Sequence, residues 1–253
     1  MDIKLKNELQ YALTLPQFPL SAKYDIEWVN ENEMGPSSIW LTEFLCEKIK
    51  FTEGMKVLDL GCGKAMSSIF LVKEFGVEVW ATDLWINAED NAKRIEEQGL
   101  SALIKPIHAE CHNLPFERGF FDVIVSLDSY HYYGTDEMYL TYLMDYLKKD
   151  GQVGIVVTSV LKEFDGKIPK HLLPYWEPYL FTHHTAEWWK AIWERSWKVD
   201  VTTADYMPNG YKNWLLWDKT LKEAGVLHRS GDVEMLEVDG GNFTFVRIVA
   251  KKK

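Results

Sequence analysis

The chain has 253 residues, a length that fits one α/β domain or such a core with an added cap. Hydrophobic residues make up 47% and charged residues 26%, a balance that excludes a disordered protein. The formal net charge is -10, and such a surface repels both nucleic acid and anionic membranes, so we expect neither as a partner.

The three cysteines are far apart, at Cys46, Cys62 and Cys111, and cannot build a disulfide framework or a four-cysteine zinc site. This usage is typical of a reducing cytoplasm. Residues 1–8 are charged and do not resemble a signal peptide, and no run approaches the ~20 apolar residues of a membrane helix. We therefore expect a soluble cytoplasmic protein, either a monomer or a homodimer.

The first fifty residues have helical character with polar breaks, including a helical pattern over 41–49, and we expect them to form a helical cap. From residue 51, short apolar runs alternate with segments of helical periodicity. Such alternation predicts βαβ units, a parallel sheet buried on both faces and a doubly wound α/β core over 51–158. The expected strands are 56–60, 77–82, 103–107, 121–126 and 151–158, and the expected helices are 65–75, 88–98 and 136–147.

Residues 159–184 interrupt this rhythm with three prolines and several aromatic residues. We expect this insert and the N-terminal cap to form a lid over the edge of the sheet where ligands bind in such folds. Residues 185–253 should complete the sheet. The expected elements there are a helix over 186–197, a strand over 199–204, a helix over 211–224 and a β-hairpin of 233–238 and 243–250 around Asp239-Gly240-Gly241-Asn242.

The segment Asp59-Leu60-Gly61-Cys62-Gly63 leads from a strand through a tight turn into a helix. Gly61 and Gly63 permit positive φ angles and close approach of a ligand to the backbone. The following helix N-terminus offers unpaired N–H groups to a carboxylate or phosphate. Asp83 ends the next strand, where one carboxylate can bind both hydroxyls of a ribose. Asp59 favours a ligand that carries an ammonium group.

Other phosphate-binding patterns fit less well. A dinucleotide fingerprint requires a third glycine where this chain has Met66, so an NAD-dependent oxidoreductase remains only if Met66 can replace that glycine. The P-loop spacing fails because Leu58 stands where its first glycine should be.

Taken in order, these motifs resemble the class I S-adenosylmethionine-dependent methyltransferases, near the small-molecule "type 11" group, over roughly residues 51–160. The resemblance implies a Rossmann-like methyltransferase fold with a mostly parallel seven-stranded sheet. It implies S-adenosylmethionine as the cofactor and S-adenosylhomocysteine as the product.

The resemblance also implies roles for individual residues along the expected sheet edge. Asp59, Gly61, Cys62 and Gly63 match the motif that cradles the methionine part of the cofactor. Asp83, with Leu84 beside it, matches the ribose acid. Residues 110–116 match the adenine motif through Glu110 and Cys111, and Leu127 ends the strand that meets the methyl donor. Two positions depart from the family pattern: the usual third glycine is Ala65, and the adenine acid is Glu110 where Asp is commoner.

The loop over 127–134 would face both cofactor and acceptor, and His131 and Tyr130 are the candidates for a general base. Aromatic residues make up 14% of the chain. A ring of them would suit a cationic acceptor such as an amine, or would exclude water from an apolar acceptor, or would only pack the core. The aromatic residues expected near the site are Tyr11, Trp28, Trp40, Tyr175, Trp176 and Trp214.

We therefore expect an enzyme that methylates a small molecule, first at nitrogen and otherwise at oxygen or carbon with His131 as the base. A non-catalytic S-adenosylmethionine sensor or assembly protein is the alternative. His108, Cys111 and His112 could together bind a metal, but their segment already matches the adenine motif, so no metal is expected. His183 and His184 precede a helix and are expected to form a solvated cap.

Overall fold

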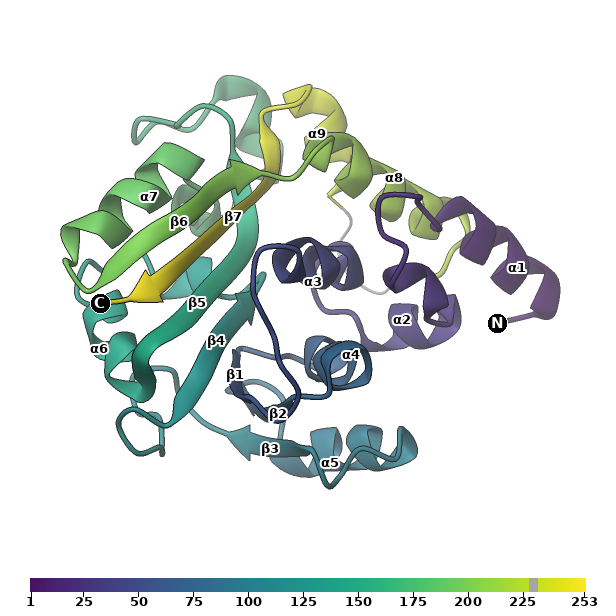
Figure 1. Cartoon of the computed structure of the whole chain (residues 1–253). Helices are drawn as coiled ribbons and strands as arrows, with labels where there is room; N and C mark the ends of the chain where they lie inside the picture. Colours follow the sequence, from purple (N-terminus) through teal and green to yellow (C-terminus); the bar gives the residue numbers. More distant parts are fainter. Residues whose placement is uncertain (228–231) are drawn as a thin grey trace.

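The computed structural model describes residues 1–227 and 232–253, and in this part of the chain a seven-stranded sheet forms the centre (Figure 1). The strand order is β3-β2-β1-β4-β5-β7-β6. Strands β1 to β5 pair in parallel, whereas β7 runs antiparallel to both of its neighbours. The strands are β1 (Lys56–Leu60), β2 (Glu78–Asp83), β3 (Ile104–His108), β4 (Phe121–Leu127), β5 (Leu147–Val160), β6 (Val199–Tyr206) and β7 (Phe243–Lys252). The expected doubly wound, mostly parallel seven-stranded fold is confirmed.

Both faces of the sheet are buried, because successive residues of a strand point to opposite sides. Along β1, Val57 belongs to one hydrophobic cluster and Leu58 to another. The first cluster lies under the helices α3 (Ser38–Cys46), α4 (Met66–Phe75) and α8 (Gly210–Glu223). The second lies under α6 (Tyr139–Leu143) and α7 (Ala186–Arg195). This double burial explains why the core strands appear in the sequence as continuous apolar runs.

The remaining helices lie at the ends of the chain and along the sheet edge (Figure 1). They are α1 (Ile3–Ala12), α2 (Ile26–Asn32), α5 (Ala88–Glu97) and α9 (Val233–Asp239), with short 3-10 turns η1 (Ser21–Lys23), η2 (Tyr130–Tyr132), η3 (Met144–Tyr146), η4 (Lys170–Tyr175) and η5 (Pro178–Thr182). In the described residues, no helix combines the length and the apolar character needed to cross a bilayer.

The predicted hairpin at the C-terminal end is wrong. Residues 233–238 lie in α9, and Gly240 ends that helix with a left-handed φ of 71°. Val233 and Leu236 are three positions apart, a spacing that places both on the buried face of a helix. The Asp239 carboxylate accepts hydrogen bonds from the N–H groups of residues 241 to 243, so the glycine pair belongs to a helix end that leads into β7.

The expected helix over 136–147 is also shorter than predicted. Only Tyr139–Leu143 is α-helical, and the 3-10 turn η3 follows it. Strand β5 begins at Leu147 and is longer than the run of 151–158, because its end pairs with β7 as far as Val160.

Candidate active site

A cavity of about 530 Å³ opens at the carboxyl ends of β1, β2 and β4. The strand order reverses between β1 and β4, which is the place where open α/β sheets bind ligands. The turn after β1 contributes Gly61 to Gly63, the segment after β2 contributes Asp83 to Trp85, and the segment after β4 contributes Leu127 to Ser129. The volume of the cavity is within the usual range for a small-molecule site.

The glycine turn is shaped by the neighbouring strand ends. The N–H groups of Gly61 and Cys62 both donate to the carbonyl oxygen of Thr82, at 2.9 Å each. Gly61 has a φ of +72°, and a Cβ atom placed there would collide with the Ser129 hydroxyl. The position therefore requires glycine because of its conformation and because the backbone passes close to the segment after β4.

Ala65 stands where the resembling motif usually has its third glycine, and it has a left-handed backbone conformation. Its φ is 61° in the left-handed region, directly before α4, and its side chain is fully buried. Alanine is the smallest side chain that can occupy this position, at some cost in conformational free energy.

Asp83 is held rigidly at the cavity wall. Its Oδ2 accepts a hydrogen bond of 2.8 Å from the Gly63 N–H. Its Oδ1 accepts from the N–H groups of Trp85 and Ile86, at 2.7 and 2.9 Å. A carboxylate has roughly four lone-pair sites, so three backbone bonds leave it able to accept another hydrogen bond.

Asp59 is not among the described residues that line the cavity. It lies on the same face of β1 as Val57, which is the face that α4 covers. Its Oδ2 accepts hydrogen bonds of 2.6 Å from the hydroxyls of Ser67 and Ser68 in the first turn of α4. Burial raises the pKa of the Asp59 carboxyl to about 6, against the lowering effect of these two bonds. Strand alternation therefore points the Asp59 side chain under the glycine turn, toward α4.

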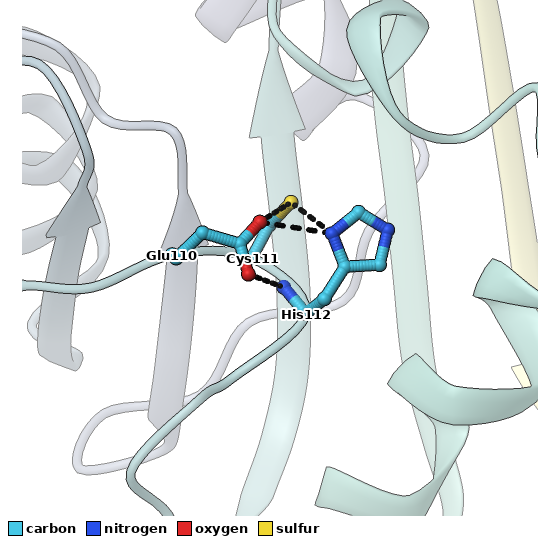
Figure 2. A group of neighbouring side chains, drawn as sticks. All are labelled: Glu110, Cys111 and His112. Atoms are coloured by element: carbon cyan, nitrogen blue, oxygen red, sulfur yellow. Dashed lines mark hydrogen bonds and ion pairs between the residues drawn. The ribbon is translucent and has the colours of Figure 1, made fainter.

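Glu110, Cys111 and His112 form a compact cluster at the end of the cavity next to β3 (Figure 2). Glu110 Oε1 lies 2.8 Å from His112 Nδ1 and accepts a hydrogen bond of 3.2 Å from the Cys111 thiol. Its Oε2 accepts from the backbone N–H of His112 at 2.9 Å. The hydrogen bonds from His112 lower the pKa of Glu110, whereas burial and then the neighbouring Glu110 raise the pKa of Cys111 to about 12.

The nitrogen, sulfur and oxygen donors of this cluster would suit zinc, but a thiol with a raised pKa is a poor ligand until a metal displaces its proton. His108, which the sequence offered as a further member of such a group, lies outside it and contacts the carbonyl oxygen of Leu84 through Nε2 at 2.8 Å. The cluster's hydrogen bonds instead keep the Glu110 carboxylate charged beside the cavity.

His131 and His183 also line the cavity. Their ring centroids are 5.3 Å apart, and both side chains are almost completely buried. Burial lowers the pKa of both rings, to about 3 for His183, and the neighbouring His183 lowers the pKa of His131 further. Both imidazoles are therefore uncharged at neutral pH. His183 was expected in a solvated cap, and that expectation is wrong because η5 turns its ring inward.

Tyr130 is not among the described residues that line the cavity. It is fully buried and packs among aromatic rings of α6 and α7, including Trp189 and Trp193. Of the two candidate bases, the structure brings only His131 to the cavity.

The aromatic residues of the cavity wall differ from those expected. In the described part of the chain, only Trp214 of the six expected residues lines the cavity. Trp40 instead packs in the core against Phe18 and Trp217. The aromatic residues that do line the cavity beside Trp214 are Trp85, Tyr132, Tyr133 and Tyr179. Trp85 lies two residues after Asp83 in the sequence, and Tyr132 and Tyr133 directly follow His131. This nearness to candidate site residues was the signal that could have placed them at the cavity.

The sheet order, the glycine turn and the strand-end acids together define a Rossmann-like domain built to bind a nucleoside at one end of a cavity. Comparison with known proteins narrows this class. Residues 57–151 match the family model described as a methyltransferase domain.

Among curated proteins, the sarcosine/dimethylglycine N-methyltransferase of Aphanothece halophytica is 35% identical over 95 residues, which are 37% of this chain and 34% of that protein. Phosphoethanolamine N-methyltransferase 1 of Arabidopsis thaliana is 31% identical over 113 residues, 44% of this chain and 23% of that protein. The chain thus spans about a third or less of the length of these two relatives.

Solved structures extend the similarity of fold beyond this segment. Geranyl diphosphate methyltransferase in complex with S-adenosylmethionine has a TM-score of 0.70 at 18% identity, covering 96% of this chain and 94% of that one. Phosphoethanolamine N-methyltransferase 2 of Haemonchus contortus has a TM-score of 0.72 at 18% identity, covering 99% of this chain and 60% of that one. Residues 57–151 are thus similar to methyltransferase domains, and the chain has the fold of solved S-adenosylmethionine-dependent methyltransferases, in agreement with the resemblance carried by its motifs.

Proposed function

We propose that this protein is an S-adenosylmethionine-dependent methyltransferase that methylates a nitrogen atom of a small molecule. One observation carries the proposal: a single cavity joins the glycine turn, Asp83 and Glu110 to the His131 and His183 pair. A cofactor at one end and an acceptor at the other would meet inside this enclosure. The relatives whose names specify N-methylation of small molecules support the choice of nitrogen.

The cofactor site follows the order of the strand ends. The backbone of Gly61, Cys62 and Gly63 would hold the methionine part, and Asp59 would support that turn through α4 as a positioning residue. The ribose hydroxyls would bind Asp83 beside Leu84, and the adenine would lie against Glu110 and Cys111. Leu127 at the end of β4 would lie near the methyl group.

When bound, S-adenosylmethionine supplies a methyl group already activated by its sulfonium. The nitrogen lone pair forms the new N–C bond, and the electron pair of the breaking C–S bond stays on sulfur, which leaves S-adenosylhomocysteine. The protein's task is to position the acceptor and exclude water, effects that can supply ~7–11 kcal/mol. The faces of Tyr132, Tyr179 and Trp214 would stabilise the positive charge that develops on nitrogen.

A second candidate is methylation at oxygen or carbon, for which His131 would remove the proton. The uncharged ring offers a lone pair for that proton, but its lowered pKa makes it a weak base, so methylation at nitrogen, which needs no base, ranks first. A third candidate is an S-adenosylmethionine sensor without turnover, which would use the same cofactor site.

The remaining parts of the proposal rest on the sequence. Residues 1–50 would form a cap, 51–158 the cofactor-binding core, 159–184 a lid insert and 185–253 the completion of the sheet. The protein would act in the cytoplasm as a monomer or homodimer, on a small molecule and without nucleic acid or membrane partners.

The test uses the purified protein, S-adenosylmethionine labelled in its methyl group and an aqueous metabolite extract. The enzyme should release label in a small product and form S-adenosylhomocysteine in equal amount. Label that stays bound in a one-to-one complex, with no product, would support the sensor instead. Failure to bind S-adenosylhomocysteine in calorimetry would contradict both.

A further inference from the structure

Four buried polar atoms in the cavity wall have no hydrogen-bond partner within the described residues: His131 Nδ1, His183 Nδ1, Thr158 Oγ1 and Trp214 Nε1. Their residues are 2%, 1%, 5% and 3% exposed. They come from four separate elements, namely η2, the turn after η5, β5 and α8. We call these four residues the inner polar wall.

The members of the inner polar wall are neighbours in space. His131 and His183 have ring centroids 5.3 Å apart. The Phe243 ring contacts both His183 and Trp214, at centroid distances of 6.0 and 6.1 Å. Thr158 pairs with Phe245 across β5 and β7, and the Phe245 ring is 5.0 Å from that of Trp214. The unpartnered atoms therefore belong to neighbouring residues of the cavity wall.

Folded proteins give nearly all buried polar groups a partner, because a buried group without one loses its hydration and gains nothing in return. Four such atoms in one wall indicate that the occupant of the cavity supplies their partners. The indole N–H of Trp214 can only donate, so it requires an acceptor atom on the occupant, and the Thr158 hydroxyl can also donate to it.

The two histidines impose a different requirement. Each ring is uncharged, because burial lowers its pKa, and an uncharged imidazole offers one lone pair and one N–H. A lone pair can accept a hydrogen bond from an N–H group of a methyl acceptor. It would also stabilise the positive charge that grows on nitrogen, whereas a charged imidazolium would repel it.

We propose that the inner polar wall binds the methyl acceptor, and that this acceptor is a small polar amine that also carries a hydrogen-bond-accepting oxygen. The amine binds unprotonated and donates its N–H to the histidine pair, and the oxygen accepts from Trp214 Nε1 and Thr158 Oγ1. The nitrogen lone pair forms the bond to the methyl carbon, and the methylated ammonium product then releases its proton to solvent. An apolar acceptor such as an isoprenoid chain would leave all four groups unpaired. This inference rests on the proposed function and specifies its substrate class.

The test combines product analysis with conservative variants. Wild-type enzyme is incubated with methyl-labelled S-adenosylmethionine and, separately, the aqueous and the lipid fraction of a cell extract, and the labelled product is identified by mass spectrometry. Trp214→Phe and Thr158→Val each remove one hydrogen-bond donor while keeping the shape of the side chain. Trp189→Phe is the matched control, because its indole nitrogen is also buried and unpartnered but lies outside the described cavity wall.

We expect a labelled aqueous product with an N-methyl group and a neighbouring oxygen. Trp214→Phe and Thr158→Val should each lower kcat/KM for the acceptor by about tenfold, mainly through KM, while S-adenosylhomocysteine affinity stays unchanged. Calorimetry with S-adenosylhomocysteine shows that each variant is folded. His183→Asn, which keeps a neutral hydrogen-bonding group, should retain more activity than His183→Phe.

Label that enters only the lipid fraction would overturn the inference, as would Trp214→Phe and Thr158→Val variants that match Trp189→Phe in acceptor kcat/KM. Each of these results would leave the methyltransferase proposal standing. Binding of S-adenosylhomocysteine without transfer to either fraction would instead contradict the proposed enzyme activity itself.

Discussion

The carboxylate of Asp83 accepts a hydrogen bond of 2.8 Å from the backbone N–H of Gly63. The two residues are brought together by the parallel pairing of β1 and β2, in which Leu60 lies beside Thr82. The acid proposed for the ribose and the turn proposed for the methionine part therefore form one unit. A change in either residue should affect both ends of the cofactor.

Replacement of Asp83 by Ala should weaken S-adenosylhomocysteine binding by about 10- to 100-fold, because hydrogen bonds to a charged group contribute roughly 1.5–3 kcal/mol. Isothermal titration calorimetry measures this effect. Asp90→Ala, on the exposed surface of α5, is the control and should bind normally. Equal affinity in Asp83→Ala and wild type would remove the ribose assignment.

Gly61→Ala should impair both folding stability and cofactor binding, because the new Cβ collides with the Ser129 hydroxyl. Gly54→Ala is a matched control: its φ of +76° imposes similar backbone strain, but no atom lies within 4 Å of the added Cβ. Thermal unfolding with and without S-adenosylhomocysteine separates the two effects. The collision is disproved if both variants lose the same stability and bind equally well.

The collision can also be relieved directly. Adding Ser129→Ala to Gly61→Ala removes the hydroxyl that the new Cβ meets, so the double variant should recover part of the lost binding. A double variant no better than Gly61→Ala would show that the φ of the glycine alone accounts for the loss.

Asp59→Asn should become more stable relative to wild type as the pH rises from 4 to 7. Burial raises the pKa of Asp59 from 3.8 to about 6 in the folded protein, so the folded state loses stability as this carboxyl ionises over that range. Asparagine does not ionise and avoids the loss. A pKa shift of about two units corresponds to roughly 3 kcal/mol. The difference in free energy of unfolding between Asp59→Asn and wild type should change by this amount between pH 4 and 7.

Urea denaturation of both proteins at pH 4, 5.5 and 7 measures this difference. Asp90→Asn serves as the exposed control on α5. A difference between Asp59→Asn and wild type that stays constant with pH would mean that Asp59 is not a buried carboxyl of raised pKa.

Glu110→Ala should weaken binding of S-adenosylhomocysteine by about tenfold, because it removes the carboxylate that we propose accepts a hydrogen bond from the adenine amine. The inosine analogue of this ligand has a carbonyl oxygen in place of that amine, so its binding should change little or improve. Calorimetry with both ligands shows whether Glu110 binds the adenine amine or only holds its own loop in place. An equal loss for both ligands would indicate that Glu110 acts only by holding its loop through His112.

Local pattern in the sequence was sufficient for much of the fold. Strand β1 coincides with the predicted 56–60, and the helix over 88–98 differs from α5 by one residue at its end. Both are elements whose periodicity and end signals are contained within a dozen residues. The segment 233–238 shows the limit of this approach, since its apolar spacing fits a strand or a helix and β7 pairs with β5 and β6 instead.

The clustering of the residues proposed for the cofactor was also largely predictable. The glycine turn comes directly after β1, Asp83 ends β2 and Glu110 comes just after β3, so parallel pairing alone brings them to one edge of the sheet. The orientation of the Asp59 side chain was not predicted, because the side of the strand on which it lies depends on what α4 covers. The packing of α4 on β1 and the hydrogen bonds from the Ser67 and Ser68 hydroxyls orient the Asp59 side chain.

The sequence by itself determined most of the strands and helices, the nucleoside-binding motifs and the class of protein, because these depend on residues that are close together in the chain. The tertiary structure decided which aromatic and polar side chains face the acceptor. His131, Thr158, His183 and Trp214 come from elements spread over more than eighty residues, and only the packing of β5, β7 and α8 around one cavity brings them together. No local pattern marks such residues, because each is buried as an ordinary core side chain would be.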